Sequence, residues 1–179
     1  STAEGTLEFT VLFFIPKKAP ADIYRADYQP GVKLYVNRVF ITDDDKELLP
    51  TWLRFVKGVI DSSDLPLNVS REILQQNRIM AKIKSNSVKK VLDKIKTISK
   101  NKDKYEGFYN EFGRLLKEGV YQEFEHKEAL TELLRFKSTK EDGYVSLQDY
   151  VDRMDSDQKS IYYITGTNEL ALRESPLLE

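Results

Sequence analysis

The chain has 179 residues, of which 40% are hydrophobic and 32% charged, so it can bury the core of one domain or somewhat more. A formal net charge of -1 argues against a dedicated nucleic-acid-binding protein, and the lack of cysteine excludes disulfides and thiolate metal sites. No apolar run approaches the roughly 18 residues of a membrane span. There is neither a signal peptide nor an initial methionine, so we expect an excised piece of a longer protein.

Two strands are predicted in the first quarter of the chain. Residues 6–16 are rich in β-branched and aromatic types and stop at Pro16, and residues 32–42 alternate between apolar and polar types. Pro20, Pro30 and Gly31 mark the segment between them as a loop. A short helix over 50–58, with Pro50 in its first turn, and a brief strand at "VID" follow.

The middle of the chain is predicted to be helical. A long helix is expected from Ser70, with one apolar stripe and an opposite lysine-rich face. The stripe consists of Ile79, Ile83, Val91, Leu92, Ile95 and Ile98. "FYNEFGRLLKEGV" and "EHKEALTELLRF" continue the helical pattern, and the lysine face is interpreted as a solvated surface rather than an RNA-binding patch.

The last forty residues predict a linker, a helix, a strand and a second helix. "STKEDGYVS" has the composition of a linker, and Ser146 with Asp149 approximates a capping box for "LQDYVDRM". "KSIYYITG" predicts a strand and "TNELALRES" a helix. A single strand has no sheet to join, so this end is expected to be the truncated start of a second α/β subdomain.

Most candidate reactive groups have an ordinary structural explanation. Asp43–Asp45, Asp61 and Asp64 do not match a calcium-loop spacing, and aspartates are common in turns, so no metal site is expected. His126, the only histidine, has no serine or cysteine motif around it, so a catalytic triad is not expected. A Gly-rich phosphate loop is missing from the sequence. Trp52 is interpreted as a core residue, with an exposed anchor for a partner protein as the alternative.

Arg71 is the unusual residue, because it follows the expected N-cap Ser70 in a first helical turn, where acids are favoured. It could pair with Glu72 or Asp64, or lie on the surface. Alternatively, free N–H groups, the helix dipole and a guanidinium favour an anion such as phosphate at this place. Gln75 lies one turn on and Asn68 lies close before it, so an arginine finger is one interpretation of the loop.

Four stretches resemble the middle domain of the 90-kDa heat-shock protein (HtpG-type) family of ATP-dependent chaperones. They are "GVKLYVNRVFITDD", "LPTWLRFVKGVIDSSDLPLNVSREILQQNRIM", "LLRFKST" and "QKSIYYITG", and the similarity extends from "EGTLEF" to "SPLLE". The resemblance implies an α/β (α+β) fold. A large three-layer α/β/α subdomain over 1–100 with a catalytic loop at 64–75 would be followed by a helical connector over 101–140 and a truncated small α/β subdomain over 141–179.

The same resemblance implies the site residues. Arg71 would be the catalytic residue that reaches the γ-phosphate of ATP held by a separate N-terminal domain, and Asn68 and Gln75 would help to place the loop near the nucleotide. Phe40, Leu65 and Leu67 would pack between the domains, and Trp52 is the candidate client-binding residue. ATP and Mg²⁺ would be held mainly by the N-terminal domain, with neither bound by this chain and no metal ligand in it.

The expected function is that of the middle segment of an ATP-dependent molecular chaperone of the stress response. The full-length protein would be a cytoplasmic, homodimeric ATPase that couples hydrolysis to protein folding, and this fragment alone would be inactive. Its partners would be its own N-terminal domain, unfolded client proteins and cochaperones, with no nucleic acid and no membrane. A passive protein-interaction scaffold without a role in hydrolysis is the alternative.

Overall fold

The structure is a computed structural model that describes residues 2–3, 8–43, 47–67 and 77–178. The chain divides into two compact units, Ser1–Leu133 and Leu134–Glu179. The first unit holds the five-stranded sheet, the long helices and most of the buried side chains, so it contains the principal core.

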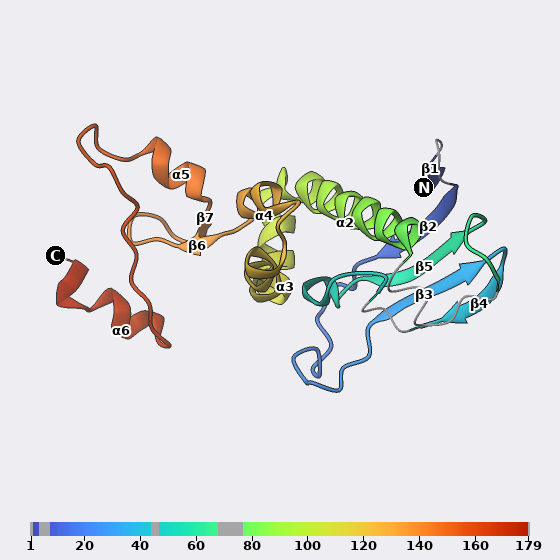
Figure 1. Ribbon diagram of the computed structural model, residues 1–179. Coiled ribbons are helices and arrows are strands. Elements are labelled where there is room, and N and C mark those ends of the chain that lie inside the picture. The colour runs from blue at the N-terminus through green and yellow to red at the C-terminus, as the bar shows by residue number, and fades with distance from the viewer. Residues whose placement is uncertain (1, 4–7, 44–46, 68–76, 179) are drawn as a thin grey trace. The chain divides into compact units, whose positions relative to one another are not determined.

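The first unit is built on a mixed five-stranded sheet (Figure 1). Its strands follow in the order β1 (Thr2–Ala3), β2 (Phe9–Phe14), β5 (Lys57–Ser62), β3 (Gly31–Val36) and β4 (Val39–Thr42). The β5–β3 pair is parallel and the other neighbours are antiparallel. Strand β5, the last of these in the sequence, therefore lies in the middle of the sheet.

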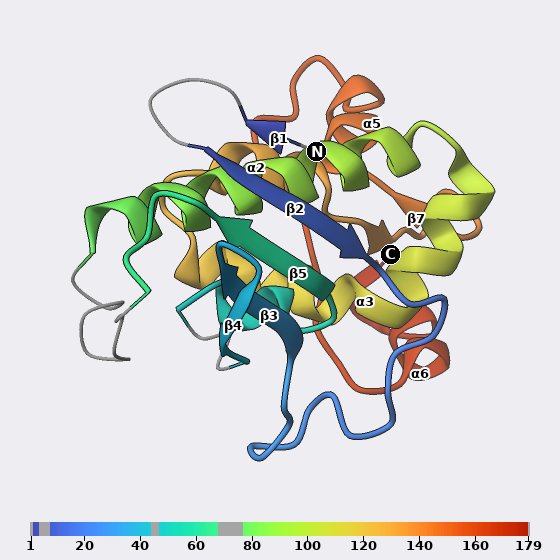
Figure 2. The same ribbon diagram turned by 90° about the vertical axis from the view of Figure 1, so that its right-hand side faces the viewer.

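Alternate residues of the strands and one face of each long helix form the core. Helix α2 (Arg78–Ser99) and helix α3 (Lys102–Gln122) lie behind the sheet in Figure 2, with α4 (Lys127–Glu132) and the 3-10 helix η1 (Thr51–Leu53) packed against α3. The face of β2 that carries Leu12 and Phe14 leaves both side chains more than half exposed. Among the described residues, the long helices therefore cover one face of this sheet.

The helix and strand types of this unit agree with the sequence predictions, but several boundaries were wrong. Residues 32–42 form not one strand but a hairpin, because Asn37 (φ 49°) and Arg38 (φ 67°) adopt the left-handed conformation that a tight two-residue turn requires. The short helix at 50–58 is reduced to η1, since β5 already begins at Lys57 and extends "VID" in both directions. Pro50 occupies the N-cap position in place of the first turn.

The long helix begins later than predicted. Asn77 has an extended backbone (φ -83°, ψ 120°), and its side chain accepts hydrogen bonds from the N–H groups of Ile79 and Met80 at 2.8 and 3.4 Å. Asn77 is therefore the N-cap of α2, which begins at Arg78, and the predicted start at Ser70 lies outside the described residues. The buried stripe of α2 also differs slightly, since Met80 and Val88 are buried whereas Ile79 and Ile98 are only half-buried.

The second unit has little buried surface. It contains a two-stranded sheet of β6 (Phe136–Lys137) and β7 (Tyr144–Val145), followed by α5 (Leu147–Asp152), α6 (Glu169–Arg173) and the 3-10 helix η2 (Pro176–Leu178). The predicted linker is thus a hairpin, in which Gly143 has φ 84°. The capping box of Ser146 and Asp149 is confirmed.

"KSIYYITG" does not form the predicted strand. Residues 159–166 have no strand partner among the described residues, and Tyr162 and Tyr163 are 74% and 86% exposed. A strand needs a paired neighbour, so β propensity alone does not produce one here. The helix predicted after it is present as α6, with Asn168 as its N-cap.

The mixed α/β class expected from the sequence is confirmed. The internal contacts divide the chain after Leu133. A separate connector over 101–140 and a small subdomain from 141 stay predictions about the domain organisation.

Candidate functional site

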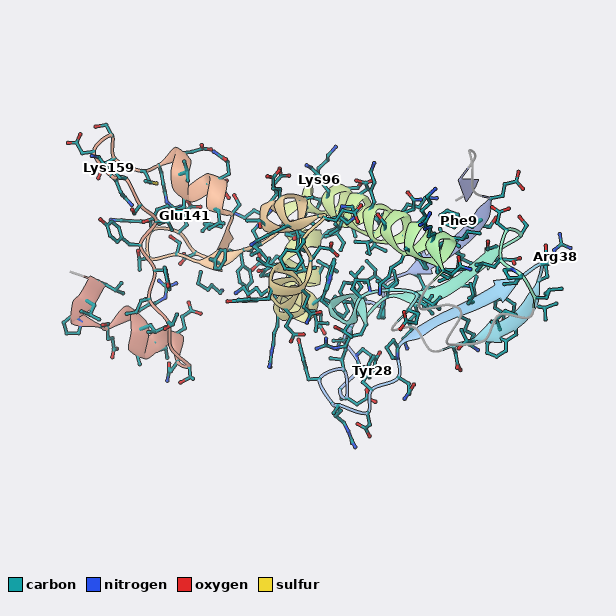
Figure 3. The ribbon with its side chains drawn as sticks, in the orientation of Figure 1. Phe9, Tyr28, Arg38, Lys96, Glu141 and Lys159 are labelled. Atoms are coloured by element: carbon teal, nitrogen blue, oxygen red, sulfur yellow. The ribbon has the colours of Figure 1, made fainter. Side chains whose placement is uncertain are left out.

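The candidate loop leaves the sheet at the end of β5, between two other strand ends. Ser62, the last residue of β5, is paired with Phe9 at the start of β2 and with Val36 at the end of β3. Phe9 and Arg38 lie at the same end of the sheet (Figure 3). The loop therefore starts at the end of the sheet where the start of β2, the end of β5 and the β3–β4 turn lie next to one another.

Described residues mark both ends of the loop. Leu65 is buried with 2% of its surface exposed, Leu67 is 57% exposed, and Asn77 caps α2 on the far side. Asn68, Arg71 and Gln75, the residues to which the sequence assigns the nucleotide, lie outside the described residues. The structure thus describes the two ends of the loop to which these three residues belong.

Phe40 lies on the edge strand β4, directly after the turn. Its ring is 50% exposed and packs edge to face on Tyr35, with 5.8 Å between ring centroids and an interplanar angle of 71°. Tyr35 in turn is paired with Asp61 of β5. Phe40 therefore presents apolar surface close to the stem of the loop, and the interdomain packing of Phe40, Leu65 and Leu67 stays a prediction.

Trp52 lies in the core. It is fully buried, and its indole packs against α3 at Gly119. The core interpretation is confirmed, and the alternative of an exposed anchor is wrong for this conformation, because the short amphipathic helix here faces inward. The candidate client contact at Trp52 would require the unit to open.

The lysine-rich face of α2 takes part in contacts within the chain. Lys96 Nζ lies 2.7 Å from Glu132 Oε2 of α4, and Lys90 lies over the ring of Phe9 at 5.4 Å from its centroid. Glu132 raises the pKa of Lys96. Lys82, Lys89, Lys94 and Lys100 are exposed.

His126 and the aspartates Asp61 and Asp64 lie in different parts of the first unit, and Asp44 and Asp45 lie outside the described residues. His126 is the N-cap of α4, and its Nε2 lies 3.8 Å from a carboxylate oxygen of Glu125. Within the described part of the chain, no group of three or more histidine, aspartate or glutamate side chains is placed to hold a metal ion. Asp61, in β5, and Asp64, just after it, instead accept hydrogen bonds from backbone N–H groups, a role that the sequence did not predict.

Comparison with known proteins identifies the family. The whole chain, residues 1–179, matches the family model described as Hsp90 protein. The chaperone protein HtpG of Treponema denticola is 64% identical over 182 residues, covering 99% of this chain and 28% of the relative. The HtpG of Sulfurovum sp. is 63% identical over 176 residues, covering 98% of this chain and 28% of the relative.

A solved structure matches at the level of the fold. The middle domain of a Plasmodium falciparum putative heat shock protein superposes with a TM-score of 0.86 at 32% identity, covering 99% of this chain and 70% of that chain. The present chain spans little more than a quarter of the curated relatives it matches. None of the described helices combines the length and hydropathy needed to cross a bilayer. This chain belongs to the Hsp90 family, and its fold is that of an Hsp90 middle domain.

Proposed function

We propose that this chain is the segment of an ATP-driven chaperone that delivers Arg71 to the γ-phosphate of ATP. ATP and Mg²⁺ would be held mainly by a separate N-terminal domain of the full-length protein, and the γ-phosphoryl group of this ATP would be the group transferred to water. Among the residues of this chain, Asn68 and Gln75 help to place the loop. The segment has no turnover by itself.

The position of the loop stem supports this proposal most directly. Leu65 is buried beyond the end of β5, and Leu67 then leaves the fold with more than half of its surface exposed. Phe40, also half exposed, follows the turn next to β5. Exposed apolar groups beside a loop that carries an arginine suit a surface that another domain covers, because docking removes water around the ion pair.

The charge of Arg71 has a clear physical use in this arrangement. A guanidinium donates several hydrogen bonds in one plane and stabilises the negative charge that spreads over the transferred phosphoryl group. Such an arginine finger is worth about 10³–10⁵ in rate in the best-known cases, or roughly 4–7 kcal/mol. A smaller gain than the top of that range is expected here. The unfavourable charge at the helix start that the sequence predicts for Arg71 would cost only about 0.3–1 kcal/mol.

The full-length protein is accordingly proposed to be a cytoplasmic homodimer that couples ATP hydrolysis to the folding of client proteins in the stress response. Closure of the N-terminal domain onto this segment would bring Arg71 to the nucleotide. Client proteins and cochaperones are its proposed partners, and client contacts are spread over a surface that includes this segment.

The test is the turnover of full-length variants. Arg71→Ala is expected to lower kcat strongly with little change in nucleotide Kd, and Arg71→Lys to restore only part of the loss, since an ammonium lacks the planar fork. Arg25→Ala is the matched control, because this arginine is exposed in the loop before β3 and its guanidinium pairs with the neighbouring Asp27. An unchanged kcat in Arg71→Ala would contradict the proposal and favour the alternative, a passive protein-interaction scaffold without a role in hydrolysis.

A further inference from the structure

Residues at the end of β5 hold the backbone of Glu8 at the start of β2. The N–H of Glu8 donates to Asp64 Oδ2 at 2.6 Å. The hydroxyl groups of Ser62 and Ser63 both donate to the carbonyl oxygen of Glu8, each at 3.5 Å. Asp64 therefore binds the N–H of Glu8, and two hydroxyl groups of the same short segment lie at the outer limit of hydrogen-bond distance from its carbonyl oxygen.

The same segment also holds the turn on its other side. The N–H of Arg38 donates to Asp61 Oδ1 at 3.2 Å, and the N–H of Asn37 donates to the carbonyl oxygen of Ser62 at 3.2 Å. The end of β5 is therefore tied to β2 through Asp64 and to the β3–β4 hairpin through Asp61. These bonds join segments 23 and 56 residues apart in the sequence.

The segment is also fixed internally. The N–H of Asp64 donates to Ser62 Oγ at 3.3 Å, and Ser62 itself is fully buried. The bond to the Asp64 carboxylate, at 2.6 Å, has the short length of a charge-assisted hydrogen bond, whereas the bond to Asp61, at 3.2 Å, has an ordinary length. Because Asp61 and Asp64 reach opposite neighbours, the segment cannot shift toward either without losing a bond on the other side.

We propose that residues 61–64 form a clamp that positions the arginine-bearing loop for ATP hydrolysis, with Asp64 as its principal positioning residue. This inference rests on the proposed function, since it concerns how Arg71 is aimed. The loop leaves the clamp at Leu65, and its far end is fixed by the Asn77 cap. A displacement of residues 61–64 would therefore change the point from which the loop starts.

The effect on catalysis follows from the sensitivity of a reaction to the placement of its groups. Asp64→Ala removes the acceptor of the Glu8 N–H, and we expect kcat of the full-length protein to fall by roughly 3- to 10²-fold, since a misplacement of about 1 Å can cost about 10²-fold. Nucleotide Kd should stay unchanged, because the clamp does not belong to the pocket of the nucleotide-binding domain. Asp64→Asn keeps an acceptor oxygen and is expected to retain more of the activity than Asp64→Ala.

The experiment measures kcat, KM and nucleotide Kd for full-length Asp64→Ala and Asp64→Asn, alone and combined with Arg71→Ala. Asp27→Ala is the matched control, because its exposed carboxylate pairs with Arg25 in the loop before β3. If Asp64 acts through Arg71, Asp64→Ala has no further effect on kcat once Arg71 is alanine. A merely structural role would lower kcat by the same factor in both backgrounds, and that result would overturn the clamp.

The remaining outcomes separate the two proposals. If Arg71→Ala lowers kcat but Asp64→Ala does not, the clamp is wrong and the proposed function stands. If Arg71→Ala leaves kcat unchanged, the proposed function is wrong and the clamp falls with it. Should Asp64→Ala fail to fold, Asp64→Asn is compared with and without Arg71→Ala in its place. Faster amide hydrogen exchange at Glu8 reports whether the hydrogen bond from the Glu8 N–H to residue 64 is lost.

Discussion

Gly119 of α3 lies directly against the indole ring of Trp52. A Cβ at residue 119 would approach Trp52 Cδ2 to 2.8 Å and Leu130 Cδ2 to 2.8 Å, closer than real Cβ contacts. Trp52 is fully buried, so the ring has no free side to which it can move. The close approach of η1 and α4 to the long helix α3 therefore depends on the absence of a side chain at this position.

Gly119→Ala is expected to destabilise the first unit. Overpacking of a dense core costs about 1–3 kcal/mol, whereas replacement of a helical glycine by alanine gains about 0.5–1 kcal/mol, so the balance is a net loss. Urea unfolding followed by tryptophan fluorescence measures it, because Trp52 is the only tryptophan.

The matched control lies on the same helix. A Cβ added at Gly107 would meet no heavy atom within 4 Å, so Gly107→Ala should only gain helix propensity and raise the midpoint of unfolding. A loss of stability in both variants, or in neither, would contradict the packing argument at Gly119.

Arg54 fastens the loop before β3 to α3. Its guanidinium donates to the carbonyl oxygens of Ile23 and Thr51 at 2.8 and 2.9 Å and lies 2.9 Å from Glu118 Oε2. Arg54→Met keeps the apolar stem but leaves all three acceptors without this donor, and we expect a loss of about 2–4 kcal/mol in the free energy of unfolding.

Arg54→Lys tests whether the shape of the guanidinium matters. A single ammonium group cannot reach three acceptors in different directions, so lysine should recover little of the loss. Arg25→Met removes an exposed pair with Asp27 and is expected to change stability by less than about 0.5 kcal/mol. Wild-type stability of Arg54→Lys in chemical denaturation would show that charge alone suffices.

The capping box of α5 gives the second unit a dependence on pH. The backbone N–H of Ser146 donates to Asp149 Oδ2 at 2.8 Å, and this bond, together with the Ser146 hydroxyl, lowers the pKa of Asp149 below its ordinary value of 3.8. Since the pKa is lower in the folded state, the stabilisation is fully present above pH 3.8 and is lost as the pH falls through the folded pKa.

The measurement is an NMR titration of the Asp149 carboxyl carbon, with amide exchange in α5 as the readout of helix stability. The free energy of opening should decrease on acidification in the wild type, and the decrease should be smaller in Asp149→Asn, which cannot titrate at this position. Titration of Asp149 at or above 3.8 would contradict the role of the capping box.

The sequence predicted element types well where the local pattern and the tertiary context agree. The stripe of α2, the strand β2 and the capping box at Ser146 all have a periodicity or cap that local interactions reinforce. The hairpin at Asn37 was missed because an arginine at positive φ is rare, and the turn is stabilised from outside by the Asp61 carboxylate. The strand at 159–166 was overpredicted because propensity does not supply a pairing partner.

The candidate site likewise has one part that the sequence predicted and one part that it could not predict. Arg71 stood out because the sequence predicts it in a first helical turn, where its charge would oppose the helix dipole, and such a local conflict points to function. The clamp could not be predicted, since Glu8 and Asp64 are brought together only by the antiparallel pairing of β2 with β5. Aspartates after a strand suggested either turns or metal ligands, and only the register decides which backbone N–H groups they meet.

The turn between β3 and β4 offers a stabilising substitution. Arg38 has φ 67°, a conformation that costs a residue with a side chain roughly 1–2 kcal/mol and glycine almost nothing. Arg38→Gly gives the Asn-Gly sequence that two-residue hairpin turns prefer, and it keeps the N–H that donates to Asp61. We expect the free energy of unfolding to rise by about 1 kcal/mol, measured by urea denaturation.

Arg38→Ala isolates the backbone contribution in this last comparison. Alanine removes the same guanidinium as glycine does but retains the Cβ that disfavours positive φ, so it should not stabilise the chain. Equal stability of Arg38→Gly and Arg38→Ala would mean that the left-handed conformation at Arg38 stores no strain. A higher stability of the glycine variant would show that the positive φ of Arg38 destabilises the wild-type turn. In the wild type, the hydrogen bond from the Arg38 N–H to Asp61 would then offset part of this cost.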